Sequence, residues 1–375
     1  MKKKLMMLIL PLMLLMGCDT TTPSTPQEKF EPKTNYGIAP MFDDTLGIYD
    51  KDPAIFKEDG KKYTFFTTNE TKYVTGDVIG LRIGTENENG ETVYDKTTQI
   101  VLRASENDWD SMRVSNPDVI KGEFAYQNVT YSYLMAFQGT SKVKDKLYQI
   151  GFAVSNDLLN WKKVGNEPII KYSSYAYGSA YGVGAPSLVS YDQKGKFYCF
   201  YTYADALITT TRVSYFDCSS LDDIKTGEAS AISSKGLEDK SGDVVFNNAD
   251  FMIDKESNTI YCVRDRNPVM TMPATSDSIQ VAKADLKILV NPNDYEWTLV
   301  TRSISDLDTA LLDGEESQEF GWERIYSACL ISDAYGHKLA GDKLPLAFSV
   351  SAVGVGSENN NYLYSGAIVY YEVNL

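Results

Sequence analysis

The chain has 375 residues, of which 43% are hydrophobic and 12% are aromatic, and its formal net charge is −15. This length allows a sizeable core in one large domain or in two smaller ones. The acidic balance argues against nucleic acid as a partner, because phosphate backbones attract basic patches, and against electrostatic attachment to anionic lipid. The 26 tyrosines, with many Phe, Val, Ile and Thr residues, favour pleated sheets and predict a mostly β protein.

The N-terminus is typical of a signal peptide over residues 1–17. Three lysines at positions 2–4 precede an apolar run at 5–16 that is too short to form a stable transmembrane helix. The run ends in Leu15-Met16-Gly17-Cys18, which resembles a bacterial lipobox, so Cys18 is the predicted lipidation site. The alternative is an ordinary secretory signal followed by an incidental cysteine.

The next segment, residues 18–36, begins with this cysteine and continues as a polar, proline-rich stretch that predicts a disordered tether. Removal of residues 1–17 takes away three lysines and changes the formal charge to −18, so the lipid would have to hold the protein at the membrane. We expect a protein anchored by lipid to the cell membrane and facing outside the cytoplasm. The folded domain is expected over residues 37–375.

A short pattern recurs five times along the rest of the chain. Each copy has an apolar run at a strand entrance, followed by a turn and a second β-rich run. The copies lie at Asp52–Phe56, 116–120, 185–189, 249–253 and 327–331. A hairpin repeated in this way predicts an all-β fold, a five-bladed β-propeller. The expected blades span about 45–105, 110–175, 182–225, 245–303 and 321–375, and the polar segments 222–243, 304–319 and 354–361 are expected to be loops.

Four cysteines remain after Cys18: Cys199, Cys218, Cys262 and Cys329. Their spacings fit no zinc pattern, and no acidic cluster has the spacing of a cation-binding loop, so no metal and no cofactor are predicted. Three of the four lie in apolar β runs, where a free cysteine behaves as a small buried hydrophobe. Buried thiols are therefore favoured, although an extracytoplasmic compartment would also permit a disulfide.

A Tyr/Gly/Ser-rich segment at 172–184 precedes the third expected blade. Tyrosine has a flat apolar face and a polar tip, a combination suited to stacking on sugar rings. Tyr175, Tyr177 and Tyr181 are therefore predicted to bind substrate. The alternative is a rim loop that packs on itself.

The repeats carry a resemblance to a known family. Asp52-Pro53-Ala54-Ile55 with Gly60-Lys61-Lys62-Tyr63 resembles the first-blade motif of family-43-like glycoside hydrolases, which are five-bladed β-propellers. Asn116-Pro117-Asp118-Val119 resembles their second-blade motif, and Ala185-Pro186-Ser187-Leu188-Val189 is similar to the start of their third blade. Residues 151–155 with 157–161 look like a strand pair shared with related propellers that act on fructans, arabinans and mannosides. The resemblance covers about 45–375.

The resemblance implies a set of catalytic positions. In that family an aspartate in blade one is the general base, an aspartate at the third-blade start orients the acid, and a glutamate at the fourth-blade start is the general acid. Asp52 matches the base, but the second position falls on Ala185 and the third falls near 248–250, where no glutamate is present. Glycoside hydrolysis requires two carboxyl groups in opposite protonation states across the scissile bond. Asp250 and Glu323 are the candidates for the acid.

A propeller brings the inner-strand entrances of all its blades to one end of the central channel. We therefore expect Asp52, Asp118, Asp250 and Glu323 to approach one funnel. Arg113 and Arg264 are expected nearby, where they would bind substrate together with Asp118 and keep the carboxylates ionised. The plainer alternative for each acid is a structural role at a strand start. His337, the single histidine, lies in a turn-like run and is expected to be a bystander.

Three hypotheses follow. The first is a surface lipoprotein that cleaves glycosidic bonds in oligo- or polysaccharides, with Asp52 as the base and Asp250 or Glu323 as the acid. The second is a non-catalytic glycan-binding propeller, favoured by Ala185 and the missing glutamate. The third is a propeller with a purely structural or protein-interaction role.

Overall fold

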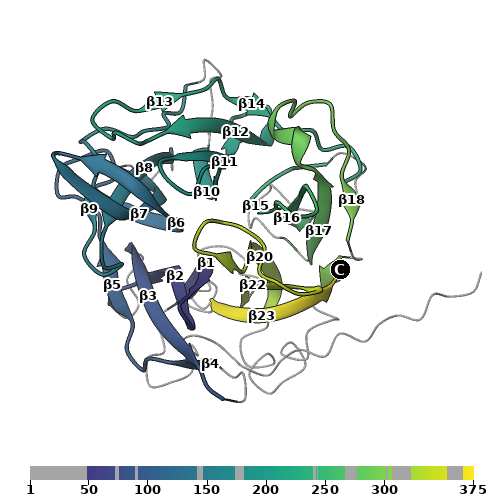
Figure 1. The fold of residues 1–375 in the computed structure, drawn as a ribbon, viewed down its shortest axis with the longest axis horizontal. Helices are drawn as coiled ribbons and strands as arrows, with labels where there is room; N and C mark the ends of the chain where they lie inside the picture. Colours follow the sequence, from purple (N-terminus) through teal and green to yellow (C-terminus); the bar gives the residue numbers. More distant parts are fainter. Residues whose placement is uncertain are drawn as a thin grey trace, which may run out of the picture. The chain divides into compact units, whose positions relative to one another are not determined.

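A computed structural model describes residues 49–71, 76–88, 92–141, 147–173, 181–239, 242, 244–266, 276, 278–300, 303–305, 322–352 and 366–375, with 305, 322–324 and 351–352 described by their backbone alone. Five sheets surround a central axis in the order of the sequence, from blade 1 to blade 5 (Figure 1). The predicted all-β, five-bladed β-propeller is thus confirmed. Residues 1–48 lie outside the described residues, so the signal peptide, Cys18 and the tether stay predictions.

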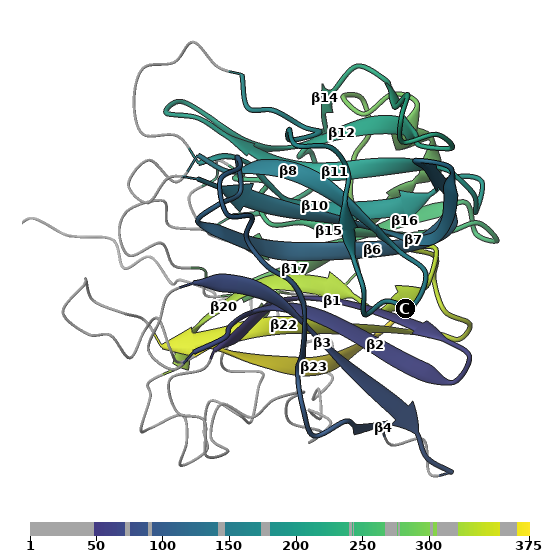
Figure 2. The ribbon, with the colours of Figure 1, turned by 90° about the vertical axis from the view of Figure 1, so that its left-hand side faces the viewer.

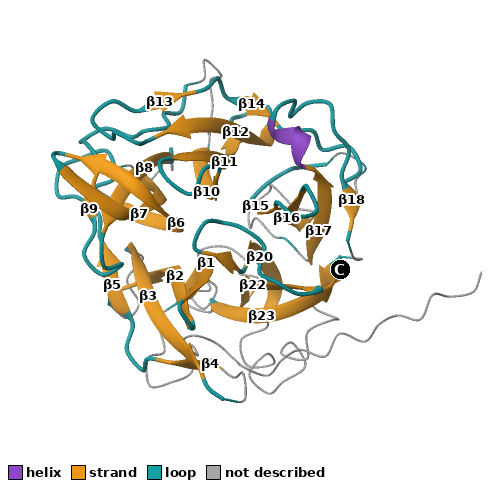
Figure 3. Ribbon diagram, in the orientation of Figure 1, coloured by secondary structure: helices purple, strands orange, loops and turns teal. Residues whose placement is uncertain are grey.

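Each blade is an antiparallel sheet whose first strand lies nearest the axis (Figure 3). Blade 1 consists of β1 (Asp50–Glu58), β2 (Lys61–Asn69), β3 (Asp77–Glu86), β4 (Thr92–Tyr94) and β5 (Gln99–Leu102). Blade 2 consists of β6 (Arg113–Tyr126), β7 (Val129–Thr140), β8 (Gln149–Ser155) and β9 (Lys162–Lys163). Blade 3 consists of β10 (Gly182–Ser190), β11 (Lys196–Ala204), β12 (Thr209–Asp217), β13 (Lys225–Thr226) and β14 (Ser230–Ala231).

Blade 4 consists of β15 (Asp250–Asp254), β16 (Thr259–Arg266), β17 (Ser278–Asp285), β18 (Thr298–Leu299) and β19 (Ile304–Ser305). A short 3-10 helix, η1 (Leu286–Leu289), follows β17. Blade 5 consists of β20 (Trp322–Leu330), β22 (Lys343–Ala352) and β23 (Ala367–Asn374), and it packs beside blade 1 (Figure 2). The expectation that 222–243 is all loop is wrong, because β13 and β14 pair with β12 there.

Alternating side chains of the strands fill the spaces between blades, because successive residues of a strand point to opposite faces of the sheet. On β11, Phe197 and Cys199 pack into the cluster shared with blade 2, whereas Phe200 packs toward blade 4. Phe200 stacks there on Phe251, with 3.9 Å between the ring centroids. The four cysteines of the folded domain are free and buried, and burial raises the pKa of each thiol. The prediction of buried thiols is confirmed.

The five repeats share one unusual backbone feature. Within the first strand of blades 1, 2, 3 and 5, and two residues before that of blade 4, one residue has a positive φ of 44–53°. This is the left-handed region that non-glycine residues rarely adopt. These five residues, which we call the entrance residues, are Asp52, Asn116, Ala185, Asn248 and Ser327. In blades 1, 2, 3 and 5 the pairing with the second strand shifts at this point, as in a β-bulge.

The entrance residues link the blades into a ring. Each backbone N–H, turned out of its own sheet, donates to a side chain on the second strand of the preceding blade at 2.7–3.0 Å. The acceptors are Thr67 for Asn116, Gln138 for Ala185, Thr202 for Asn248, Asp265 for Ser327 and, closing the circle, Ser349 for Asp52. All five acceptors are buried, so this hydrogen-bonded ring fixes the relative positions of the blades at the channel.

The other end of the channel is crossed by residues 332–338, which we call the plug. Its first strand, β21 (Ser332–Asp333), pairs in parallel with β1. Carbonyl groups of the plug then accept hydrogen bonds from the backbone N–H groups of Lys121, Ser190 and Ile253, on the inner strands of blades 2, 3 and 4. These strands surround the axis in Figure 1. Gly336 is needed in the plug because its φ is +74° and an added Cβ would lie 2.7 Å from the Leu188 carbonyl oxygen.

The hydrogen-bonded ring predicts a specific loss of stability. In Thr202→Val the side chain keeps its shape but loses the oxygen that accepts from Asn248 N, so a partly buried N–H is left without this partner. We expect the free energy of unfolding to fall by about 1–3 kcal/mol. Thr202→Ser keeps the hydroxyl and loses only a methyl group, so it should cost about 1 kcal/mol or less. Urea denaturation of both variants checks the order, and an equal loss in the two would contradict the prediction.

Candidate functional site at the channel mouth

The central channel opens into a pocket of about 340 Å³ at the entrance residues. It is lined by two or three consecutive residues from the inner segment of every blade. They are Asp52–Ala54, Asn116–Asp118, Ala185–Pro186, Asn248–Asp250 and Ser327–Cys329. The predicted funnel is therefore present, and it contains Asp52, Asp118 and Asp250.

The pocket has two layers. The entrance residues form the outer one, and among these five Asp52 is the single ionisable residue. The position of blade 4 that corresponds to Asp52 is Asn248, one residue before the repeat start expected from the sequence. The Asn248 amide donates to Asp265 at 2.8 Å. A fixed, neutral amide thus occupies the place where the resemblance implies the general acid.

The second layer, two residues further along each inner strand, forms the floor of the pocket. Ala54, Asp118, Asp250 and Cys329 line this floor, and the corresponding residue of blade 3, Ser187, is buried. Three of the polar side chains bond to the next blade. Asp118 accepts from Leu188 N, Ser187 from Phe251 N at 3.0 Å and Asp250 from Leu330 N at 2.7 Å. The floor acids therefore have a structural role between blades.

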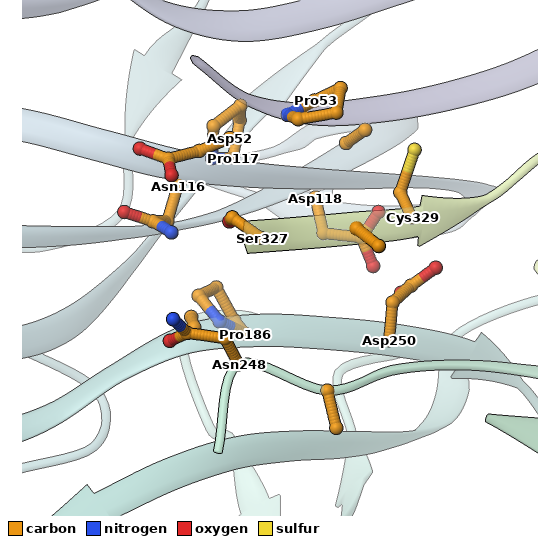
Figure 4. Close-up of a pocket in the computed structure, with 14 residues that line it drawn as sticks. Asp52, Pro53, Asn116, Pro117, Asp118, Pro186, Asn248, Asp250, Ser327 and Cys329 are labelled. Atoms are coloured by element: carbon orange, nitrogen blue, oxygen red, sulfur yellow. The ribbon is translucent and has the colours of Figure 1, made fainter. Parts of the chain in front are cut away.

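The two floor acids also lie close enough to influence one another. Figure 4 shows the carboxyl groups of Asp118 and Asp250 near each other beside Cys329, away from Asp52 and Asn248. Burial and the negative charge of Asp250 raise the pKa of Asp118 well above its usual value. Burial raises the pKa of Asp250 to about 6, although hydrogen bonds to its carboxylate oppose the shift. The protonated form of each carboxyl is therefore favoured relative to that of an exposed aspartate.

Asp52 has its own polar surroundings, which extend away from the channel as a row of alternating charges. Lys51 Nζ lies 3.9 Å from Asp52 Oδ2 and 3.7 Å from Asp77 Oδ2, and Arg113 Nη1 lies 3.6 Å from the same Asp77 oxygen. Burial alone would lower the pKa of Lys51, but the carboxylates of Asp77 and Asp52 raise it well above its usual value. Tyr49 donates to Asp77 through its hydroxyl. Arg113 is thus near the site, as expected, but it acts on Asp52 only through Asp77 and Lys51.

Tyr181 lies on the blade 3 side of Asp52. Its hydroxyl donates to Gln138 Oε1 at 2.7 Å, and the same oxygen accepts from Ala185 N at 3.0 Å. The Tyr181 ring is 5.0 Å from that of Tyr148, and burial raises the pKa of both phenols. Tyr181 and the entrance residue Ala185 are thereby linked through the same Gln138 oxygen, which fixes the position of the phenol.

The sequence analysis missed several of these residues. Lys51 adjoins Asp52, and that adjacency was an available signal. Asp77, Gln138 and Tyr148 come from other strands, and nothing in their local sequence marks them as neighbours of Asp52.

Other predicted residues lie elsewhere. Arg264 is completely buried in blade 4, where it bonds to Asp239 at 3.1 Å and to Gln280 at 2.8 Å, so the prediction that it binds substrate is wrong. His337 is buried in the plug, with Nε2 2.9 Å from the Ser190 carbonyl oxygen, at the opposite end of the channel. Burial lowers its pKa.

Some predicted residues cannot be placed. Tyr175, Tyr177 and Cys18 lie outside the described residues, as does the side chain of Glu323, whose backbone belongs to β20. Within the part of the chain that the structure describes, no group of three His, Cys, Asp or Glu side chains is arranged to hold a metal ion. In the same part, no helix is long and apolar enough to cross a membrane.

The fold and pocket define a class: five-bladed β-propellers with a pocket at the channel mouth. No protein-family model and no curated protein matches the sequence. Several solved structures, however, resemble this fold. Zg3597, a family 117 glycoside hydrolase of Zobellia galactanivorans, is 11% identical, with a TM-score of 0.56 over 92% of this chain and 90% of its own. CoXyl43, a GH43 β-xylosidase/α-arabinofuranosidase from a compost metagenome solved with xylotriose, is 16% identical, with a TM-score of 0.53 over 91% and 95%.

A third match, the α-L-arabinofuranosidase PaAbf62A from Podospora anserina solved with cellotriose, is 10% identical, with a TM-score of 0.51 over 92% and 95%. At these identities the likeness shows the fold. The chain is a propeller with the architecture of these glycoside hydrolases, and the resemblance expected from the motifs is confirmed at that level.

The raised pKa values of the floor acids predict an inverted pH dependence of stability. An aspartate in the unfolded chain titrates near pH 3.9, so between about pH 4 and 6 the folded state binds more protons than the unfolded state. The contribution of Asp250 to stability is therefore present below pH 4 and lost as the pH rises through 6. Asp250→Asn should flatten the decline in unfolding free energy over this range. Denaturant titrations at several pH values check this, and an unchanged slope would contradict it.

Proposed function

We propose that this propeller binds a carbohydrate chain at the channel mouth, with Asp52 and Tyr181 as the principal contacts. The supporting observation is the outer layer of the pocket, where a carboxylate, two amides and a hydroxyl project from Asp52, Asn116, Asn248 and Ser327. These groups suit the hydroxyls of a sugar, which both donate and accept hydrogen bonds. Two structures with the same fold hold xylotriose and cellotriose.

Binding without family-type hydrolysis is favoured by the residues at the implied catalytic positions. Asn248 is an amide that is hydrogen-bonded to Asp265, and Ala185 has no carboxyl group. A general acid must donate a proton in the transition state, which the Asn248 amide cannot do, and Ala185 has no group that could orient an acid. The pocket therefore keeps one of the three implied groups, Asp52.

Hydrolysis is the second candidate, and the floor acids favour it. Asp118 and Asp250, whose pKa values are raised, line the same pocket as Asp52. In that mechanism water attacks the anomeric carbon while Asp52 accepts the water proton. The protonated floor acid gives its proton to the departing glycosidic oxygen, and the carbon–oxygen bond breaks. Glu323 remains a proposed alternative acid.

The predicted location belongs to the same proposal: the sugar-binding domain would be carried outside the cytoplasm on a lipid attached to Cys18. The support is the sequence alone, from the basic start to the Cys18 motif. Cys18→Ser should release the protein from the membrane fraction.

The test of function uses the mature chain with arabino-, xylo-, fructo- and manno-oligosaccharides. Calorimetry should show binding of at least one of them, weakened roughly tenfold in Asp52→Asn, because hydrogen bonds to a charged group are stronger than neutral ones. Tyr181→Phe, which keeps the ring, should have a smaller effect. Lys171→Ala serves as the control, because Lys171 is exposed and does not line the pocket.

Product analysis separates the two candidates. A binding protein shows no turnover in the wild type, whereas turnover that disappears in both Asp52→Asn and Asp250→Asn establishes hydrolysis. Absence of binding and turnover with every sugar tested would contradict both and favour a structural role.

A further inference from the structure

A second and larger groove lies at the seam between the first and last blades. Its volume is about 650 Å³, and it shares no lining residue with the pocket at the channel mouth. We call it the seam groove. Its lining residues come from the outer parts of both blades: Lys57, Lys62, Glu86, Thr92, Tyr94, Ile331, Pro345, Tyr370, Tyr371 and Glu372.

Tyrosine rings form one wall of the seam groove. Tyr94 from β4 and Tyr370 from β23 lie nearly parallel, with ring planes 16° apart and centroids 6.3 Å apart, and their hydroxyls are in hydrogen-bonding contact. Lys62 Nζ lies 4.7 Å from the centre of the Tyr370 ring and donates to Thr92 Oγ1 at 2.9 Å. The wall therefore consists of aromatic rings edged by hydroxyls, and contacts across the seam hold its side chains in place, with Lys62 over the Tyr370 ring.

Charges around the seam groove are paired. Lys57 Nζ lies 2.5 Å from Glu86 Oε1, and the partner of Glu372 is Lys343 at 2.9 Å. The two lysines and two acids that line the groove thus balance in charge, and Lys57, Glu86 and Glu372 are already in ion pairs. The paired groups still hold hydrogen-bonding capacity, because a carboxylate has about four acceptor sites and an ammonium three donors.

This chemistry narrows the choice of ligand. Paired charges on two sides disfavour a lipid chain, and the balance of lysines and acids disfavours phosphates. An uncharged molecule with flat apolar faces and many hydroxyls fits both the tyrosines and the paired charges. We propose that the seam groove is a second binding site, separate from the channel mouth, for a neutral oligosaccharide segment. The argument rests on the groove alone and stands whether or not the channel pocket binds sugar.

Binding here would stabilise closure of the propeller. The groove exists only when blade 1 and blade 5 are side by side, so a ligand that touches both binds the folded chain and not the unfolded one. Such a ligand raises the free energy of unfolding by RT ln(1 + [L]/Kd), where [L] is its free concentration. A sugar in the seam groove should therefore raise the thermal midpoint in proportion to the logarithm of its concentration.

The experiment measures binding of neutral xylo-, arabino-, fructo- and manno-oligosaccharides to the mature full chain by calorimetry and thermal shift. Thr92→Trp places a large ring in the groove from a partly exposed position, and Tyr370→Phe keeps the ring while removing its hydroxyl. We expect Thr92→Trp to weaken binding at one of the sites at least tenfold and Tyr370→Phe to weaken it less. Tyr191→Ala, which removes a tyrosine that is 58% exposed on blade 3, should have no effect.

Asp52→Asn distinguishes this proposal from the function proposed for the channel mouth. Binding that persists in Asp52→Asn and is lost in Thr92→Trp supports the seam groove even if the channel pocket binds nothing. Binding that is unchanged in Thr92→Trp, or that disappears completely in Asp52→Asn, overturns it, as does the absence of binding by every neutral sugar. The thermal midpoint of each variant without sugar confirms that the variant is folded.

Discussion

The structure depends on five backbone N–H groups that leave their own sheets. A left-handed residue costs about 1–2 kcal/mol relative to ordinary backbone, and a buried N–H without a partner costs a similar amount. Both costs would arise at each entrance residue if the preceding blade did not supply a buried acceptor. Because Ser349 of blade 5 accepts from Asp52 of blade 1, the ring has no free end. Blade position and entrance geometry are therefore determined together.

This constraint explains why the pocket can change its chemistry without a change of fold. The ring uses only the backbone of the entrance residues, so Asp52, Ala185 and Asn248 occupy equivalent places with different side chains. The floor layer is less free, since the side chains of Asp118, Ser187 and Asp250 themselves bond to the next blade. Replacing an acid of the outer layer should therefore cost little stability. Replacing Asp118 or Asp250 would remove a hydrogen bond between blades, whatever chemistry these acids perform.

Sequence reasoning reached the fold because the strand entrances recur in order, with Pro or Ala after each entrance residue. It placed the fourth repeat one residue too late, since the motif there, Asn248-Ala249, lacks the proline that marks blades 1 to 3. Arg264 shows a different limit: its local sequence is that of a charged strand end, and only the packing of blade 4 reveals that the guanidinium is enclosed. Asp77 and Gln138 reach the site through strand pairing, which a local motif does not encode.

The plug has a consequence for the order of folding. Residues 332–338 belong to the last blade, yet they bond to the inner strands of all four earlier blades. During synthesis those strands emerge long before the segment that ties their ends together, and the Ser349 acceptor for Asp52 comes 297 residues after its donor. Contacts so distant in sequence make folding slow, because the loop entropy is lost before the contacts form. A chain that stops before the plug would keep the hydrogen bonds that join its first four blades at the channel mouth. It would lack both the closure onto blade 5 and the segment that ties the inner strands together at the other end of the channel.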